Sequence, residues 1–194
     1  MKKMTGGDFK NLIKKDPSWC KTLKEPLEIT TPVDLTNSAI THLSPLIAFS
    51  GENGQGWAAT FYGCKNLKIA TGNFNGFADF RESGVEKIEH LTVIGKNHNW
   101  WSASFQNCVN LKVATGTFEG HADFRNSGVT TIKDLIIKNP KEKKFRAAFE
   151  NTNITYIPKE YRESGFSFDK KPIENSIKKD TIDKIKSEEN LIEI

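Results

Sequence analysis

The sequence predicts a β-rich α/β solenoid: a leucine-rich-repeat-like stack of about six coils, with one short parallel β-sheet and helical caps. Three observations lead to this prediction. A segment repeats at a step of 44 residues, each step holds two short apolar–polar–apolar triplets, and glycine recurs where a coil has to turn. The apolar content of 37% is low for one thick core, but a coil buries only the faces that meet its neighbours.

The repeat is visible as matched segments. Residues 57–61, Trp-Ala-Ala-Thr-Phe, return as Trp-Ser-Ala-Ser-Phe at 101–105 and less closely at 145–149. Residues 61–72 return at 105–116, and residues 78–85 return at 122–129. Identity at a fixed step indicates tandem duplication, so we assign residues 34–168 to 44-residue two-coil units with a degenerate final copy.

Short strands are expected at the apolar–polar–apolar triplets 67–69, 91–93 and 111–113 and at the equivalent residues 135–137, Leu-Ile-Ile. With Leu46 and Ile154 added, the spacings run from 19 to 24 residues, close to the leucine-rich-repeat period of about 20–29. The repeated Phe residues predict two apolar columns, one at 61, 105 and 149 and one at 80 and 124. Trp57 and Trp101 repeat with them, which places both in the predicted core.

Other repeated residues have a structural interpretation too. Cys64 and Cys108 hold equivalent places before a strand, which favours small buried thiols over a disulfide or metal site. Asp79-x-Arg81 and Asp123-x-Arg125 predict a ladder of hydrogen bonds from carboxylates to turn amides.

The run Phe-x-x-Cys-x-Asn-Leu-Lys at 61–68 and 105–112 resembles the BspA-like (Treponema-type) leucine-rich repeats. The resemblance covers the first coil of each unit and implies an interaction scaffold without catalytic residues. The second coil keeps the apolar spacing but lacks Phe-x-x-Cys. Residues 78–82 and 122–126 each match one pentapeptide-repeat unit, but that competing fold needs the pentad in tandem.

The two ends differ from the repeats. Residues 1–33 are assigned to an N-terminal helical cap with a helix over 8–15 and Asp8 as its N-cap; a docking helix for a partner is the alternative. Residues 169–194 are assigned to a polar C-terminal helix or tail, helical from about Asp180 onward. This segment is either a cap, a mobile tail or an element for self-association.

Catalytic and metal-binding patterns are absent from the sequence. The four His residues do not recur at matching positions, and there is no P-loop, dinucleotide fingerprint or nucleophile elbow. We therefore expect no enzyme, no metal and no cofactor. The three cysteines, the start without an apolar leader and the lack of a span-length apolar run predict a cytoplasmic protein of a bacterium or phage, without membrane contact.

Positions at which the copies disagree are the candidates for binding, because packing does not fix them. Trp100 stands where the other copies have Gly56 and Lys144, and an aromatic residue there suits a partner-binding hot spot. The adjoining loop and one varying pair in the other coil complete the candidate set: Lys96, Asn97, His98, Asn99, Phe77 and His121. The leading hypothesis is a protein–protein interaction module, of a style that suits a mobile-element or prophage protein binding a host factor.

Two other functions stay open. Nucleic acid is a less favoured partner, because the middle of the chain is near neutral and the basic excess lies at residues 1–33 and 125–169. Its binding residues would be Lys138, Lys141, Lys143, Lys144 and Arg146. The other alternative is a self-assembling structural scaffold.

Overall fold

The computed structural model describes residues 1–138, 146–163 and 165–189. Within these residues the chain has a β-rich α/β fold with few helices and two parallel sheets of seven strands each. Sheet A contains, in spatial order, β1 (Lys2–Met4), β2 (Leu27–Ile29), β4 (Ile47–Phe49), β6 (Ile69–Phe74), β8 (Lys87–Val93), β10 (Val113–Phe118) and β12 (Thr131–Ile137). Sheet B contains β14 (Phe166–Ser167), β13 (Ala147–Ala148), β11 (His121–Asp123), β9 (Trp101–Ser104), β7 (Phe77–Asp79), β5 (Trp57–Thr60) and β3 (Val33–Asp34).

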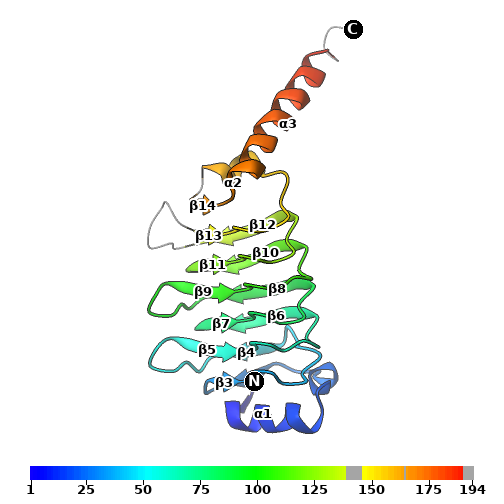
Figure 1. Cartoon of the computed structure of the whole chain (residues 1–194). Coiled ribbons are helices and arrows are strands. Elements are labelled where there is room, and N and C mark those ends of the chain that lie inside the picture. The colour runs from blue at the N-terminus through cyan, green and yellow to red at the C-terminus, as the bar shows by residue number, and fades with distance from the viewer. Residues whose placement is uncertain (139–145, 164, 190–194) are drawn as a thin grey trace.

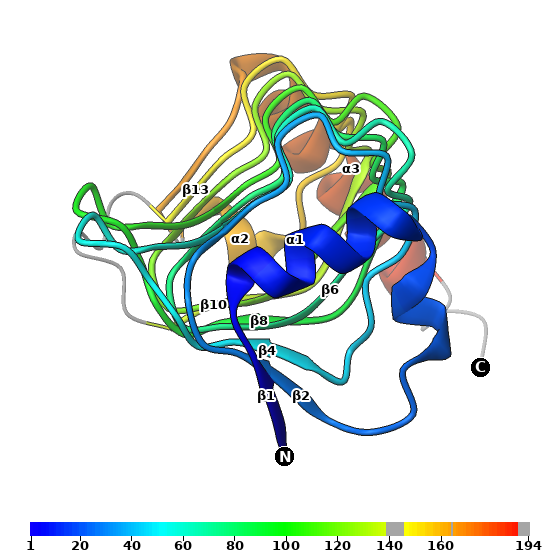
Figure 2. The ribbon, with the colours of Figure 1, turned by 90° about the horizontal axis from the view of Figure 1, so that it is seen from below.

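The chain alternates between the two sheets from β2 to β13. Figure 1 shows the strands of both sheets rising in steps, and Figure 2 shows the ribbons of successive turns lying over one another. The single sheet predicted from the sequence is therefore wrong. Strands of sheet B are only two to four residues long in the described chain, and they lack the apolar–polar alternation that marks a half-buried strand.

The predicted strand positions in sheet A are partly right. Residues 91–93 and 135–137 lie in β8 and β12, but β6 and β10 begin only at the last residues of their triplets. Leu67 and Leu111 lie in turns instead, because their N–H groups donate to the carbonyls of Cys64 (3.2 Å) and Cys108 (3.1 Å). Both leucines are buried, which explains why their spacing looks like that of strand residues.

One continuous column of stacked rings runs through the hydrophobic core. Successive ring centroids along it are 5.0–5.3 Å apart, close to the 4.7–4.9 Å between neighbouring strands. The column consists of Phe61, Phe80, Phe105, Phe124, Phe149 and Phe168. The two columns predicted from the sequence are thus one, because coils of the two kinds alternate along the stack.

One corner of the chain has the same geometry at six places in the described residues. Two residues after each inward-facing Leu or Phe, the backbone is left-handed, with φ between 55° and 68°. These residues are Asn37, Gly63, Glu82, Asn107, Asn126 and Asn151. The N–H groups of the first five donate to carbonyls of the next turn of the chain at 2.8–3.0 Å.

Helix α1 (Gly6–Lys15) lies across the N-terminal end of the stack (Figures 1 and 2). Its N-cap is Thr5, whose Oγ1 accepts a hydrogen bond from the backbone N–H of Asp8 at 3.1 Å, so the prediction of Asp8 as the cap is wrong. Asp8 lies in the first turn, where a carboxylate is favourable. Phe9 is fully buried and its ring lies 5.8 Å from that of Phe49, which closes this end of the core.

Helix α3 (Lys170–Glu189) begins ten residues earlier than predicted and projects from the opposite end (Figure 1). Ser176 is buried in its first half, and its Oγ hydrogen-bonds the backbone N–H of Ile157. Asp180 forms an ion pair with Arg162 of the short helix α2 (Lys159–Arg162). A 3₁₀ turn, η1 (Trp19–Thr22), follows α1.

Candidate functional site

Two loops occupy equivalent places where the chain passes from sheet A to sheet B. Residues 50–56 join β4 to β5, and residues 94–100 join β8 to β9 (Figure 1). Asn53 and Asn97 hold them in the same way, because each Oδ1 accepts two backbone N–H groups at 2.9–3.1 Å. The predicted candidate Asn97 therefore also shapes its loop.

The loops touch each other. The backbone N–H of His98 donates to the carbonyl of Gln55 at 3.3 Å, and the carbonyl of Lys96 lies close above Gly56. His98 and Asn99 are exposed at the tip, whereas Lys96 and Asn97 are partly buried. We name these two loops, with the outer face of sheet B beside them, the loop corner.

Trp100 lies at the end of the second loop with a left-handed backbone, φ +68°. Its equivalent Gly56 has φ +81°. A bulky residue in this region costs about 1–3 kcal/mol, so the fold alone does not favour tryptophan here. The ring is half-buried, with the ammonium of Lys96 4.5 Å from its centroid, and the same ammonium lies 3.6 Å from Glu119.

Phe77 and His121 begin β7 and β11, and they lie at the loop corner as well. Phe77 is 4% exposed and its ring lies 4.7 Å from that of Trp57; His121 is 6% exposed and lies 5.8 Å from Trp101. The structure thus brings all seven predicted residues to one region. These two, being buried, act there as supports for the neighbouring tryptophans rather than as exposed contacts.

Trp57 and Trp101 are half-buried on the outer face of sheet B, so the prediction that they lie in the core is wrong. Trp57 is four residues before the inward-facing Phe61, and regular alternation would put both on one face. The register shifts between Trp57 and Ala59, and this bulge turns the tryptophan outward. The same shift occurs where Trp101 pairs with His121.

The predicted ladder of carboxylates is confirmed. The Oδ1 atoms of Asp34, Asp79 and Asp123 each accept the backbone N–H two residues later, at 2.9–3.0 Å. Asp79 and Asp123 also bind the guanidinium groups of Arg81 and Arg125 through two contacts each, at 2.7–2.9 Å. These hydrogen bonds raise the pKa of both arginines, which keeps the two guanidinium groups protonated.

A hollow of about 180 Å³ lies between the two Asp–Arg pairs. Ser104 and Gln106 of the intervening coil line it together with Arg81 and Arg125, and Trp57, Phe77, Asn97 and Trp101 border it on the side of the loops. Sequence reasoning missed Ser104, Gln106 and the two tryptophans. The sequence did contain a signal, because the residue at this repeat position differs between units: Tyr62 in the preceding unit, Gln106 here and Glu150 in the following one.

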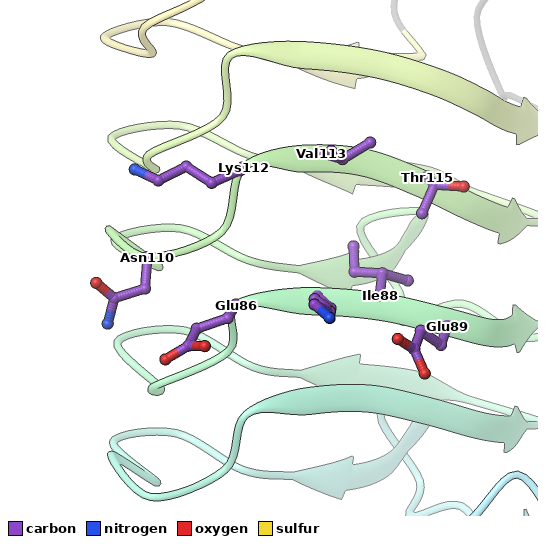
Figure 3. Close-up of a pocket in the computed structure, with 8 residues that line it drawn as sticks. Glu86, Ile88, Glu89, Asn110, Lys112, Val113 and Thr115 are labelled. Atoms are coloured by element: carbon purple, nitrogen blue, oxygen red, sulfur yellow. The ribbon is translucent and has the colours of Figure 1, made fainter.

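A larger hollow of about 610 Å³ lies on sheet A between β8 and β10 (Figure 3). These strands pair only at Thr92–Thr117 and Val93–Phe118, whereas β6 and β8 pair over five positions. Figure 3 shows Ile88 and Val113 on either side of the gap. The seven predicted binding residues do not line it.

The alternative nucleic-acid set is only partly placed. Lys138 is exposed just after β12, and Arg146 is partly buried, with its carbonyl accepting the N–H of Ala122 at 3.1 Å. Lys141, Lys143 and Lys144 lie outside the described residues.

Cys64 and Cys108 are buried, as predicted, and Cys20 is buried as well. The Sγ atoms of Cys64 and Cys108 donate to the carbonyls of Leu35 and Phe80 at 3.0 Å, and burial raises the pKa of both thiols. Among the described residues, no group of three or more His, Cys, Asp or Glu side chains is arranged to hold a metal ion.

Comparison with profiles of protein families, with curated proteins and with solved structures found no match. In the described part of the chain, no helix combines the length and apolar character needed to cross a bilayer.

Proposed function

We propose that this chain is a leucine-rich-repeat-like solenoid that serves as a non-catalytic protein–protein interaction module. The repeated left-handed corner, the column of stacked rings and the alternation of strands support the solenoid. The resemblance of residues 61–68 and 105–112 to BspA-like repeats agrees with it, although those segments lead into strands rather than forming them.

The docking surface in this proposal is the loop corner. Trp100 is the observation that carries it, because tryptophan stands at a backbone position whose equivalent is glycine. Strained residues of this kind concentrate at sites that act on other molecules. Trp57 and Trp101 add half-buried aromatic area beside it, and tryptophan and arginine are the residue types enriched in protein hot spots.

A protein partner fits this surface better than nucleic acid. Arg81 and Arg125 are each neutralised by a buried carboxylate, and Lys96 lies 3.6 Å from Glu119. The corner therefore offers little of the unpaired positive charge that phosphate backbones require. Of the candidate nucleic-acid set, the described residues include only Lys138, which is exposed, and Arg146, which is partly buried.

The test exchanges one loop for the other. Lys96→Glu, His98→Gly, Asn99→Gln and Trp100→Gly together give the second loop the sequence of residues 52–56 and keep Asn97. Because that sequence already forms the equivalent loop, we expect unchanged circular dichroism and melting temperature. Affinity purification from the source cells should lose a specific protein that the wild type retains.

The matched control places Glu52→Lys, Gly54→His and Gln55→Asn in the first loop and leaves Gly56 in place. This control should retain the partner. An identical set of captured proteins for wild type and loop exchange would refute the corner as the docking surface. Binding of a DNA or RNA duplex that weakens steeply with salt would instead support the nucleic-acid alternative.

A further inference from the structure

The hollow between the two Asp–Arg pairs has an occupied counterpart within the same chain. Tyr62 holds the position equivalent to Gln106, 44 residues earlier. Its ring lies beside the guanidinium of Arg81, with Cζ 5.5 Å from the ring centroid. A hydrogen bond to Glu82 raises the pKa of the Tyr62 hydroxyl. One coil thus already uses a phenol ring against a paired guanidinium.

The next unit repeats the guanidinium but lacks a tyrosine beside it; the Cζ of Arg125 instead lies 5.9 Å from the ring centroid of Trp101. Gln106 replaces the tyrosine, and the hollow beside it is lined by Arg125 on one side and Arg81 on the other. Its volume of about 180 Å³ is below the roughly 300–1,000 Å³ of typical small-molecule sites. The space suits one large side chain rather than a cofactor.

The charges around the hollow select among possible side chains. Asp79 and Asp123 are buried and paired with the two guanidiniums, so the four groups sum to no net charge. An anionic side chain therefore gains little from entering. A guanidinium paired along its edge also attracts aromatic rings to its planar face, as for Tyr62 at Arg81 and Trp101 at Arg125. The hollow between the two arginines offers room for one more ring.

We propose that the hollow over Ser104 and Gln106 binds an aromatic side chain of a partner protein, tyrosine being the closest match to the internal ring of Tyr62. This inference rests on the proposed function, to which it adds the chemical identity of the anchor residue. Ser104 and Gln106 offer a hydroxyl and an amide to the phenol hydroxyl, and Trp57 and Trp101 line the hollow with aromatic surface.

The test uses the full chain labelled with ¹⁵N and titrated with N-acetyl-tyrosine amide. A ligand of this size has an expected Kd on the order of 1 mM. Amide shifts should concentrate at Ser104, Gln106 and Arg125. N-acetyl-leucine amide and N-acetyl-aspartate amide, at the same concentrations, should give clearly smaller shifts.

Two reciprocal variants sharpen the result. Gln106→Tyr places the chain's own ring beside Arg125, so it should abolish the titration while the melting temperature stays close to that of the wild type. Tyr62→Gln opens the equivalent space beside Arg81, so it should add a second set of shifts around Thr60 and Arg81.

Each contrary outcome overturns the inference. Equal shifts with the leucine amide would make the hollow a general apolar site, and stronger shifts with the aspartate amide would make it an anion site. Scattered shifts that persist in Gln106→Tyr would place binding elsewhere. If tyrosine amide fails while the loop exchange still removes a captured protein, this inference falls and the proposed function stands.

Discussion

Trp100 and Gly56 lie 44 residues apart and share a left-handed backbone, with φ of +68° and +81°. Their backbone carbonyls accept equivalent hydrogen bonds. That of Trp100 accepts the N–H of His121, and that of Gly56 accepts the N–H of Phe77, both at 2.7 Å. The fold therefore uses this backbone conformation in both of the units in which the structure describes this position. It does not need a tryptophan side chain to hold it.

Replacing Trp100 by glycine should leave stability within about 1 kcal/mol of the wild type. The left-handed backbone becomes unstrained, a gain of about 1–3 kcal/mol, while the contact with Lys96 and some buried ring area are lost. Urea unfolding followed by circular dichroism measures the difference. A loss of more than about 2 kcal/mol would mean that Trp100 is a packing residue, contrary to its role in docking.

Gly56→Ala is the matched counterpart, and we expect it to destabilise by about 2 kcal/mol or more. An added Cβ would lie 2.5 Å from the carbonyl oxygen of Lys96, and the backbone conformation disfavours alanine. The same urea experiment compares the two variants. Equal stability of both would contradict the equivalence of the positions.

The column of stacked rings should be sensitive at its centre. Phe105 is fully buried and stacks on Phe80 at 5.1 Å and on Phe124 at 5.3 Å. Phe105→Ala should cost about 3–5 kcal/mol, because it removes a large side chain and leaves a cavity between two rings. Phe105→Leu, which keeps most of the volume, should cost clearly less. Similar losses for the two variants would argue that the cavity is not the cause.

The buried thiols predict how stability varies at high pH. Burial raises the pKa of Cys108 from 9.0 to about 11 and that of Cys20 to about 12. As pH rises, these thiols therefore lose their protons in the unfolded chain at a lower pH than in the folded chain. The contribution of the protonated, buried Cys108 thiol to the free energy of unfolding is on the order of 2 kcal/mol. It is complete below pH 9 and is lost as pH rises toward 11.

Urea unfolding at pH 8, 9.5 and 10.5 checks this, with Cys108→Ser as the control. The variant should lose less stability than the wild type over that range. At pH 8, a thiol reagent should label the three cysteines only in denaturant, since all three are buried. Fast labelling of the folded chain would contradict the burial of the thiols.

The stacking of the chain was predictable because identity at a step of 44 residues constrains which side chains become neighbours. Phe61, Phe105 and Phe149 were placed correctly in a column, but the sequence did not reveal that Phe80 and Phe124 interleave with them. Sheet B was not predictable. Its strands are very short, and a bulge beside Trp57 breaks the alternation by which a strand is recognised.

The candidate site was partly predictable from disagreement between copies. Trp100 stands out because the fold permits, but does not require, a side chain at a position equivalent to Gly56. The difference between Tyr62 and Gln106 carried the same signal for the hollow. That difference can be interpreted only when it is known that Arg125 and Gln106 line the same hollow. The sequence does not show that these two residues are neighbours.

The last prediction concerns the coupling between Asp123 and Arg125. Asp123 is 4% exposed, and the guanidinium of Arg125 supplies two of its hydrogen bonds, at 2.8 and 2.9 Å. Arg125→Gln leaves a buried carboxylate with fewer partners, and since Arg125 is itself partly exposed we expect a loss of about 1–3 kcal/mol.

The double variant Asp123→Ser with Arg125→Gln should recover much of that loss. Ser104 and Gln106 already stand at these two positions of the neighbouring coil, so the pair is compatible with the corner. Asp123→Ser alone leaves the guanidinium without its carboxylate and should also destabilise. A double-mutant cycle from urea unfolding should give a coupling of about 0.5–3 kcal/mol. Simple additivity of the two losses would show that the carboxylate is held by the turn amide of Arg125 and not by its side chain.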